Sequence, residues 1–448
     1  MTATAQPVPD LEPAIQALGR RLADLSARRR HPVARAEDRF TAMLAAEPDL
    51  RAALFRFVDV RPACADEADV ARHLAELLAT APGSAAQRAA ALAGRPLGRT
   101  ALARLASAAV TRMAHRFIVG QDPAAALPKV TSLWTRGIAT TVDLLGEATV
   151  TEAEADRYAR RCAEALRTLH DAARGWPARP LLEADAAGPI PRANLSVKVS
   201  ALTPVLRPLA PERGIADARE RLRRLLRLAR DLGAHLHVDM ETFDSRDAVL
   251  GLTLELLAEP EFADGPSAGV VLQAYLEESP EHLDALLGWA RDHPRAQPLT
   301  VRLVKGAYWD HEVVEARQHG WRPPVHTDRR ACDRTFELLT RRLVDAFPLV
   351  RPAIASHNLR SLAHAVAYAD ARGLTPADVE LQVLRGLGDA TQDALAAAGR
   401  RVRCYCPVGD LVAGMSYLVR RLLENTSNDS FLSAQAAGED LDTLLEAP

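Results

Sequence analysis

Eight short runs rich in β-branched and apolar residues succeed one another after residue 128, and most are followed by a charged amphipathic stretch. The runs are residues 141–145, 195–199, 235–239, 270–275, 301–305, 353–357, 381–384 and 402–406. The stretches between them include helical patterns at 151–173, 216–232 and 362–372, and this alternation is typical of a parallel sheet. Eight such units favour an α/β fold with a closed (β/α)8 TIM-like barrel. The alternative is an open doubly wound sheet, but no GxGxxG motif follows the first run.

The chain before the first run has a different pattern of apolar and charged residues. Residues 11–120 are almost wholly helix-like, with Ala, Leu and Arg at helical spacing and breaks at prolines. We therefore expect an α-helical N-terminal arm over residues 1–125, a barrel over 126–432 and a tail or linker over 433–448. A chain of 448 residues is long enough for a large barrel with an accessory helical region.

Composition excludes several kinds of partner. A net charge of -2 provides no overall attraction to nucleic acid or to an anionic membrane surface. The Arg28–Arg30 run is interpreted as a solvated face, because no aromatic residues or DNA-binding motif accompany it. The five cysteines show neither a CxxC pair nor zinc spacing with histidine, so we expect no metal site and a cytoplasmic setting. No apolar run is long enough to span a bilayer.

Polar residues gather late in the predicted strands or just after them, where the active site of a barrel lies. They are Glu147, Lys198, Asp239 with Glu241, Gln273, Arg302 with Lys305, His357 with Asn358, and Tyr405. A lysine between two valines of a strand is costly in a core unless its ammonium has a partner. For Lys198 the nearest candidate partner is Asp239, on the next strand. Each residue alone is more often a satisfied core group, but together they predict a site.

The chemistry of these residues suits a bound organic cofactor. The sequence has no GxSxG nucleophile motif and no P-loop, and the predicted barrel mouth offers cations and amides rather than nucleophiles. For a flavin, Arg302 and Lys305 could stabilise the anionic reduced ring and the phosphates. Gln273 has the donor and acceptor to recognise a ring edge, and Gly306 permits close backbone approach.

A predicted helix near the end of the chain carries two adjacent arginines. At helical spacing Tyr417, Arg420, Arg421 and Glu424 share one polar face, whereas the opposite apolar stripe comprises Leu411, Met415, Leu418 and Leu422. Paired guanidiniums match a carboxylate, and Glu424 could hold them in place. The face is therefore either a solvated surface or a clamp for the acid group of an amino or hydroxy acid.

At these residues the sequence resembles the proline dehydrogenase family, in particular the proline dehydrogenase part of the bifunctional proline utilisation proteins. The matching stretches are Asn194–Leu202, His237–Glu241, Val271–Tyr275, Val301–Trp309, Ser356–Asn358 and Tyr405–Phe431. Leu54–Val60 and Asp143–Glu147 are similar to the arm and the first strand of the fused proteins. Residues 326–329, His-Thr-Asp-Arg, depart from the Thr-Arg-Lys that is usual in the fused proteins.

The resemblance implies a distorted barrel with non-covalent FAD. It implies oxidation of L-proline to Δ1-pyrroline-5-carboxylate, the first step of proline catabolism, by hydride transfer from C5 to flavin N5. Electrons would pass to a membrane quinone, which implies peripheral contact with the inner face of the membrane. The sequence stops at residues 441–448, about where the fused proteins enter their aldehyde dehydrogenase domain, so a fused or separate pyrroline-5-carboxylate dehydrogenase is the expected partner.

The resemblance also implies roles for individual residues. Lys198, Asp239 and Arg302 look like the catalytic group. The residues that look like the substrate site are Lys198, Arg420 and Arg421 for the carboxylate, Leu384, Tyr405 and Tyr417 for the walls, and Glu424 as support. The residues that look like the FAD site are Asp239, Met240, Gln273, Arg302, Val304, Lys305, Gly306, Ala307, Trp309, Thr327, Ser356, His357, Asn358 and Gln382.

Two other functions remain open from the residues alone. The first is a flavin oxidase of another cyclic secondary amino acid, because the arginine pair recognises a carboxylate better than a ring. The second is a catalytically silent barrel that serves as a binding module.

Overall fold

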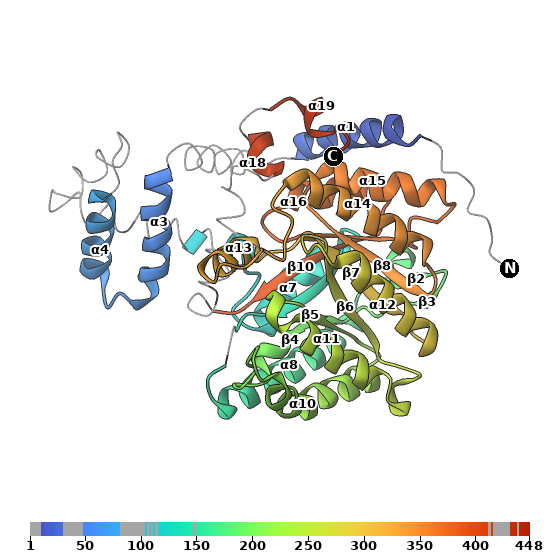
Figure 1. Cartoon of the computed structure of the whole chain (residues 1–448), viewed down its shortest axis with the longest axis horizontal. Coiled ribbons are helices and arrows are strands. Elements are labelled where there is room, and N and C mark those ends of the chain that lie inside the picture. Colours follow the sequence, from blue (N-terminus) through green and yellow to red (C-terminus); the bar gives the residue numbers. More distant parts are fainter. Residues whose placement is uncertain are drawn as a thin grey trace.

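The computed structural model describes residues 10–29, 48–80, 104, 108, 111–112, 115–146, 149–410, 414, 431–436 and 439–448. Within them, eight parallel strands close into a barrel in the order β1-β10-β9-β8-β7-β6-β5-β4 (Figure 1). The strands are β1 (Ala139–Leu144), β4 (Asn194–Lys198), β5 (His235–Asp239), β6 (Ser267–Gln273), β7 (Leu299–Val304), β8 (Val350–Ala355), β9 (Glu380–Leu384) and β10 (Val402–Val408). Each of the eight predicted runs overlaps one of these strands, so the prediction of a closed barrel is confirmed.

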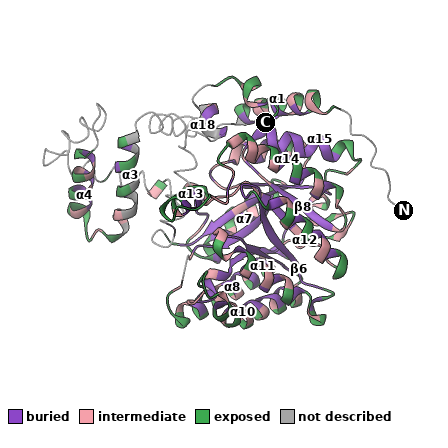
Figure 2. Ribbon diagram, in the orientation of Figure 1, coloured by how far each residue is buried: buried purple, intermediate pink, exposed green. Residues whose placement is uncertain are grey.

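Helices surround the barrel, and all but α7 come after a strand in the chain. They are α7 (Pro123–Thr135), α8 (Glu152–Ala173), α9 (Pro180–Glu183), α10 (Pro211–Asp231), α11 (Phe243–Leu257), α12 (Ser279–Asp292), α13 (Trp309–Gln318), α14 (Arg329–Asp345), α15 (Leu359–Ala371) and α16 (Asp389–Ala397). Shorter elements are the 3₁₀ turns η2 (Val199–Ala201) and η3 (Pro260–Phe262) and the hairpin β2 (Ala184–Asp185) and β3 (Gly188–Pro189). Figure 2 shows buried strands inside a ring of helices whose outer faces are exposed.

Local sequence signals explain where the helices begin. Helix α8 starts with a capping box, in which the Thr151 hydroxyl accepts from the Glu154 N–H and the Glu154 carboxylate accepts from the Thr151 N–H. Helix α15 starts at Asn358, whose Oδ1 accepts from the N–H of Arg360 at 2.9 Å. Because that cap directly follows β8, it fixes the first turn of α15 beside the mouth of the barrel.

The barrel strands are buried on both faces. Outward side chains such as Val142 and Val197 pack beneath the helices together with fully buried Leu166 and Leu222. The inward face carries polar residues instead, because alternate residues of a strand point to opposite faces. The apolar layer between strands and helices is therefore the main core, and the inside of the barrel is available for polar chemistry.

The N-terminal helix α1 (Glu12–Arg29) lies on the barrel beside α15 and α16. The buried Arg360 guanidinium links this helix to its surroundings: it donates to the Glu12 carboxylate, to Glu337 Oε1 at 2.8 Å and to the backbone carbonyl of Leu445 at 2.9 Å. The short helices α18 (Phe431–Ala436) and α19 (Leu441–Leu444) lie near α1 (Figure 1). Segments from both ends of the sequence thus cover one side of the barrel.

A second helical unit stands to the side of the barrel in Figure 1. It comprises α3 (Pro48–Val60), the 3₁₀ turn η1 (Arg61–Ala63) and α4 (Glu67–Ala79), and the two helices pack through residues such as Phe57 and Leu74. These helices confirm the prediction of a helical N-terminal region. The three-part division at residues 125 and 432 stays a prediction. None of the helices in the described ranges has the length and apolar character needed to cross a membrane.

Candidate active site

Five predicted residues and a carboxylate from β1 meet at the carboxyl ends of the barrel strands. Lys198 and Asp239 are the last residues of β4 and β5 and lie side by side in register. The other members are Arg302 from β7, Gln382 from β9, Tyr405 from β10 and Asp143 from β1. The interactions described below join all six side chains, which we call the mouth network.

Lys198 has a different principal partner from the one that the sequence predicted. Its Nζ lies 2.6 Å from Asp143 Oδ1 and 3.8 Å from Asp239 Oδ2, so the prediction of Asp239 as the nearest partner is wrong. The sequence placed Asp239 on the strand that follows β4 in the chain. It did not show that β1, which carries Asp143, pairs with the other edge of β4. Burial lowers the pKa of Lys198, but the Asp143 and Asp239 carboxylates outweigh burial, so the pKa is raised and the ammonium stays charged.

Arg302 is held by all three of its guanidinium nitrogens. Nη1 donates to Asp239 Oδ1 at 2.7 Å, Nε donates to Gln382 Oε1 at 2.7 Å and Nη2 donates to Ser196 Oγ at 3.2 Å. The guanidinium carbon also lies 5.3 Å from the centre of the Tyr405 ring, within cation–π range. These contacts fix a buried positive charge near the axis of the barrel, in one orientation.

Asp239 accepts hydrogen bonds on both oxygens. The Tyr405 hydroxyl donates to Oδ2 at 2.7 Å, while Oδ1 accepts from Arg302. Burial, followed by the charges of Asp143 and Asp239, raises the pKa of Tyr405 well above its usual value, so its hydroxyl remains a donor. Asp239 therefore orients its neighbours and is poorly placed to take a proton from a substrate.

Gln382 is oriented from below by a buried carboxylate. Its Nε2 donates to Glu380 Oε1 at 2.6 Å, which leaves Oε1 to accept from Arg302. Burial raises the pKa of Glu380, but Arg403 and Arg401 outweigh it and lower that pKa to about 2. An ionised Glu380 can only accept, so it selects the amide orientation that Arg302 requires.

The formal charges of the mouth network cancel. Lys198 and Arg302 contribute two positive charges, and Asp143 and Asp239 contribute two negative charges. A substrate carboxylate added to this network would introduce an uncompensated negative charge, which is costly in a buried site. Tight binding of an acid therefore needs a further cation beside Lys198.

The first set of the other predicted cofactor residues includes Gln273, the last residue of β6. Its Nε2 donates to the backbone carbonyl of Glu241 at 2.8 Å, and its buried Oε1 has no hydrogen-bond partner among the described residues. Such a buried acceptor is suited to a donor on a bound group, such as the N–H of a flavin ring. Met240 is buried next to Asp239 in the chain. These residues fit the predicted FAD.

A second set of predicted cofactor residues follows β7. The Lys305 ammonium contacts the Asp333 carboxylate, and Trp309 Nε1 donates to the backbone carbonyl of His326 at 2.9 Å. Gly306 has φ +134°, and a Cβ there would overlap the Tyr275 ring, so only glycine fits this turn. Val304 and Ala307 are half-buried and Thr327 is exposed.

The third set of predicted cofactor residues connects β8 to β9. Ser356 Oγ accepts from the Asn358 N–H at 3.1 Å, and the Ser356 N–H donates to the backbone carbonyl of Gln382. His357 Nε2 accepts from the Leu384 N–H at 3.0 Å. The structure therefore ties this turn to the strand that carries both Gln382 and the predicted wall residue Leu384.

Several predicted residues lie outside the described ranges. They are Glu147, Tyr417, Arg420, Arg421 and Glu424. The carboxylate clamp therefore stays a prediction from the sequence.

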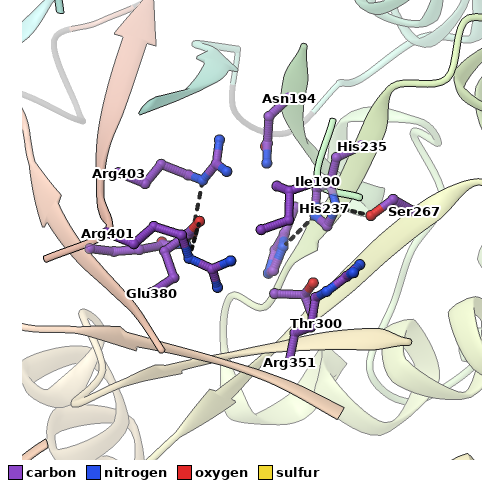
Figure 3. Close-up of a pocket in the computed structure, with 11 residues that line it drawn as sticks. Ile190, Asn194, His235, His237, Ser267, Thr300, Arg351, Glu380, Arg401 and Arg403 are labelled. Atoms are coloured by element: carbon purple, nitrogen blue, oxygen red, sulfur yellow. Dashed lines mark hydrogen bonds and ion pairs between the residues drawn. The ribbon is translucent and has the colours of Figure 1, made fainter. Parts of the chain in front are cut away.

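A small polar cavity lies at the opposite end of the barrel (Figure 3). Its lining includes Asn194, His235 and Ser267, the first residues of three strands, and it also includes Gln382 of the mouth network. His235 Nδ1 lies 2.8 Å from Ser267 Oγ, and its Nε2 lies 3.2 Å from His237 Nδ1. Burial lowers the pKa of His235 to about 3, and that of His237 well below its usual value. In (β/α)8 barrels the amino ends of the strands generally contribute to stability, whereas the active site lies at their carboxyl ends.

Sequence reasoning missed three members of the site. Asp143, Ser196 and Glu380 were not among the predicted site residues, although all three are buried on barrel strands. The signal was present in the first strand, where Thr141 and Asp143 alternate with apolar neighbours and therefore face the inside of the barrel. The positions of Ser196 and Glu380 beneath the mouth follow only from the strand register.

Comparisons with known proteins agree with this geometry. A family model described as proline dehydrogenase matches residues 126–434, and one described as the proline utilization A N-terminal domain matches residues 12–117. The bifunctional protein PutA of Salmonella typhimurium is 33% identical over 348 residues, which are 76% of this chain and 25% of that protein. Proline dehydrogenase 1 of Bacillus subtilis is 26% identical over 332 residues, covering 74% of this chain and 93% of that protein.

A solved structure extends the similarity over almost the whole chain. It is proline utilization A from Bdellovibrio bacteriovorus inactivated by N-propargylglycine, with a TM-score of 0.89 and 33% identity. The match covers 98% of this chain and 44% of that one. The present chain thus spans about a quarter of the bifunctional Salmonella relative and less than half of the solved Bdellovibrio chain.

Proposed function

Because the chain belongs to the proline dehydrogenase family, we propose that it oxidises L-proline to Δ1-pyrroline-5-carboxylate with bound FAD as the immediate electron acceptor. The observation that carries the proposal is the mouth network, in which a charged lysine and a rigidly held arginine lie together at the carboxyl end of the barrel. When bound, FAD supplies an acceptor at N5 for the hydride that leaves proline C5. As that electron pair leaves, the lone pair of the neutral ring nitrogen forms the C5=N bond.

The acid group of proline would be bound by Lys198 together with Arg420 and Arg421. Lys198 Nζ keeps donor capacity beyond its contact with Asp143, and its ammonium stays charged. Because the charges of the mouth network already cancel, we assign the added negative charge to the predicted arginine pair. Tyr417, Leu384 and Tyr405 would form the walls, with Glu424 as the support of the arginines.

The chain's own contribution to catalysis would be orientation and electrostatics. Arg302, held by three partners, provides a positive charge that counters the negative charge arriving with the hydride. Asp239, whose oxygens both accept hydrogen bonds, acts by positioning Arg302 and Tyr405. The proton of the proline nitrogen is lost before the hydride step, so no strong base is required.

We assign the cofactor contacts to the three sets around the mouth. Gln273 offers a buried acceptor that has no hydrogen-bond partner among the described residues, and Met240 is buried next to Asp239 in the chain. Val304, Lys305, Gly306, Ala307, Trp309 and Thr327 would hold one part of FAD, and Ser356, His357 and Asn358 another. Asp239, Arg302 and Gln382 complete the set of cofactor contacts.

The product and the electrons imply further partners. Quinone is the proposed final acceptor, which places the protein on the cytoplasmic side with peripheral contact to the inner face of the membrane. Δ1-Pyrroline-5-carboxylate is a reactive imine, so a pyrroline-5-carboxylate dehydrogenase, fused or separate, is the proposed consumer. Flotation with vesicles that contain quinone, with and without proline, would test the membrane contact.

The experiment that tests the activity is anaerobic reduction of the purified protein. Bleaching of a visible flavin band by L-proline supports the proposal. Bleaching only by another cyclic secondary amino acid supports an oxidase of that compound, and a colourless protein that cannot be reconstituted with FAD supports a silent binding module. Arg421→Met should raise KM for proline sharply and lower kcat, and an unchanged KM would refute the clamp.

A further inference from the structure

The second helical unit, α3 with η1 and α4, carries a cluster that the proposed oxidation does not use. Cys64 follows η1, and Asp69 and His73 lie one turn apart on α4. The Cys64 Sγ, one carboxylate oxygen of Asp69 and one ring nitrogen of His73 all lie within 4.8 Å of one another. Spacing along the chain predicted no metal site here, because a turn and a helix contribute the three residues without a CxxC or HxxxH pattern.

We propose that Cys64, Asp69 and His73 form a binding site for a zinc-class divalent cation. A thiolate, an imidazole and a carboxylate are the three ligand types that Zn²⁺ prefers, whereas Mg²⁺ and Ca²⁺ prefer oxygen ligands alone. Zinc–ligand bonds of about 2.0–2.3 Å place tetrahedral ligand atoms roughly 3.5 Å apart. His73 Nε2 and Asp69 Oδ1 are 3.5 Å apart without any metal. Three protein ligands leave a fourth position for water.

A cation already occupies the space between two of these groups. Arg72 Nη2 lies 2.5 Å from Asp69 Oδ1 and 3.0 Å from His73 Nε2, so one guanidinium nitrogen contacts both atoms at once. The Arg72 side chain is 50% exposed, and its Nη1 also contacts Glu76 Oε1 at 3.3 Å. The guanidinium can therefore move toward Glu76 when a metal ion takes its place, without leaving a buried charge unpaired.

The imidazole is also supported on its far side. His73 Nδ1 lies 3.7 Å from Glu76 Oε2, while Nε2 faces Asp69. A carboxylate behind the second ring nitrogen is the usual arrangement for a metal-ligating histidine, because it fixes the tautomer that leaves the other nitrogen free to bind. The Asp69 carboxylate is held in place by the Ala65 N–H, which donates to Oδ2 at 3.1 Å.

The location gives the metal a physical role. The α3–α4 unit stands beside the barrel with a small apolar interface of its own, and small units are commonly stabilised by a bound metal. Zinc would link the turn after η1 to the first two turns of α4. Binding replaces the S–H proton of Cys64 by a S–Zn bond and releases one proton to solvent.

Calorimetric titration of the tag-free full chain with Zn²⁺, after removal of metal by a chelator, tests the proposal. One zinc ion per chain is expected. Cys64→Ser and His73→Gln should each weaken zinc binding by more than the roughly 10-fold expected for Glu76→Gln. Cys332→Ser is the matched control, because Cys332 is another half-buried cysteine and belongs to α14.

Arg72→Met provides an independent test that does not depend on losing a ligand. It removes the competing guanidinium, so zinc should bind more tightly than in the unaltered chain, whereas a purely structural Arg72 would leave the affinity unchanged. Failure to bind zinc in the micromolar range, binding that survives both Cys64→Ser and His73→Gln, or no gain with Arg72→Met would overturn the proposal. Proline oxidation should be the same in all these variants, so the outcome is separate from that of the proposed function.

Discussion

Lys198 Nζ lies 2.6 Å from Asp143 Oδ1, across the point where the first and second strands of the barrel meet. The Asp143 side chain is 1% exposed and that of Lys198 is 10% exposed. A buried pair of this kind has a cost of desolvation that its mutual attraction offsets only while both members are present. The position of the lysine therefore depends on a carboxylate that need not touch the substrate.

Asp143→Asn should consequently impair proline binding. Without the charge, the closest carboxylate to Lys198 among the described residues is that of Asp239 at 3.8 Å, so the ammonium loses its fixed position. Loss of about 3 kcal/mol, a typical value for one member of a buried pair, corresponds to roughly a 100-fold fall in kcat/KM, mainly through KM. Steady-state kinetics with L-proline measures the effect. Asp156→Asn is the control, because Asp156 pairs with Arg221 at the surface, and equal kcat/KM in the two variants would contradict the assignment.

Arg302→Lys tests whether charge alone is sufficient at the centre of the network. Lysine keeps the positive charge but cannot donate at once to Asp239, Gln382 and Ser196. We expect kcat to fall by roughly 100-fold at saturating proline, similar to the loss of one preorganised donor. Single-turnover bleaching of the flavin band under anaerobic conditions would measure this step directly. The control is Arg227→Lys, which alters a surface pair with Glu261, and wild-type bleaching rates in Arg302→Lys would disprove the role.

The barrel was predictable because its pattern is local. Each strand is a short β-rich run beside an amphipathic stretch, as with 235–239 before α11, and the count of eight implied closure. Lys198, Asp239 and Arg302 could be placed at the mouth because they come late in their strands. For each of these residues, the sequence predicted which strand carries it and at which end of the barrel it lies.

Partners across the barrel could not be predicted in the same way. The ion pair of Lys198 with Asp143 joins residues 55 positions apart, and that of Arg302 with Asp239 joins residues 63 apart. Such contacts depend on strand register and on which strands become neighbours at closure, and neither is encoded in local periodicity. The cluster of Cys64, Asp69 and His73 was not predicted for a related reason, because the turn between two helices sets its geometry.

Tyr405→Phe should separate the hydroxyl of Tyr405 from its ring. The substitution removes the donor to Asp239 Oδ2, so we expect kcat/KM for proline to fall by about 10-fold, as for one hydrogen bond to a charged group.

The proposed place of the Tyr405 ring is beside C4 of proline, so the unaltered protein should act weakly on 4-hydroxyproline. Comparison of both substrates in both proteins provides the measurement. Equal rates on the two substrates in the unaltered protein would show that Tyr405 does not line that part of the site.

The buried histidines at the opposite end of the barrel predict how stability depends on pH. Because burial lowers the pKa of His235 from 6.5 to about 3, the unfolded chain takes up a proton in this interval that the folded chain does not. The contribution to stability is therefore fully present above pH 6.5 and is lost as the pH falls toward 3, with a slope of up to about 1.4 kcal/mol per pH unit.

His235→Gln should reduce that slope, although it also removes the contact with Ser267 and lowers stability at neutral pH. Urea unfolding followed by tryptophan fluorescence from about pH 7 to about pH 5 would give the slope for each protein. His311→Gln is the matched control, because His311 is exposed on α13 and should leave the slope as it is. If His235→Gln and the unaltered protein lose stability in parallel over this interval, a different group controls the acid sensitivity of the barrel.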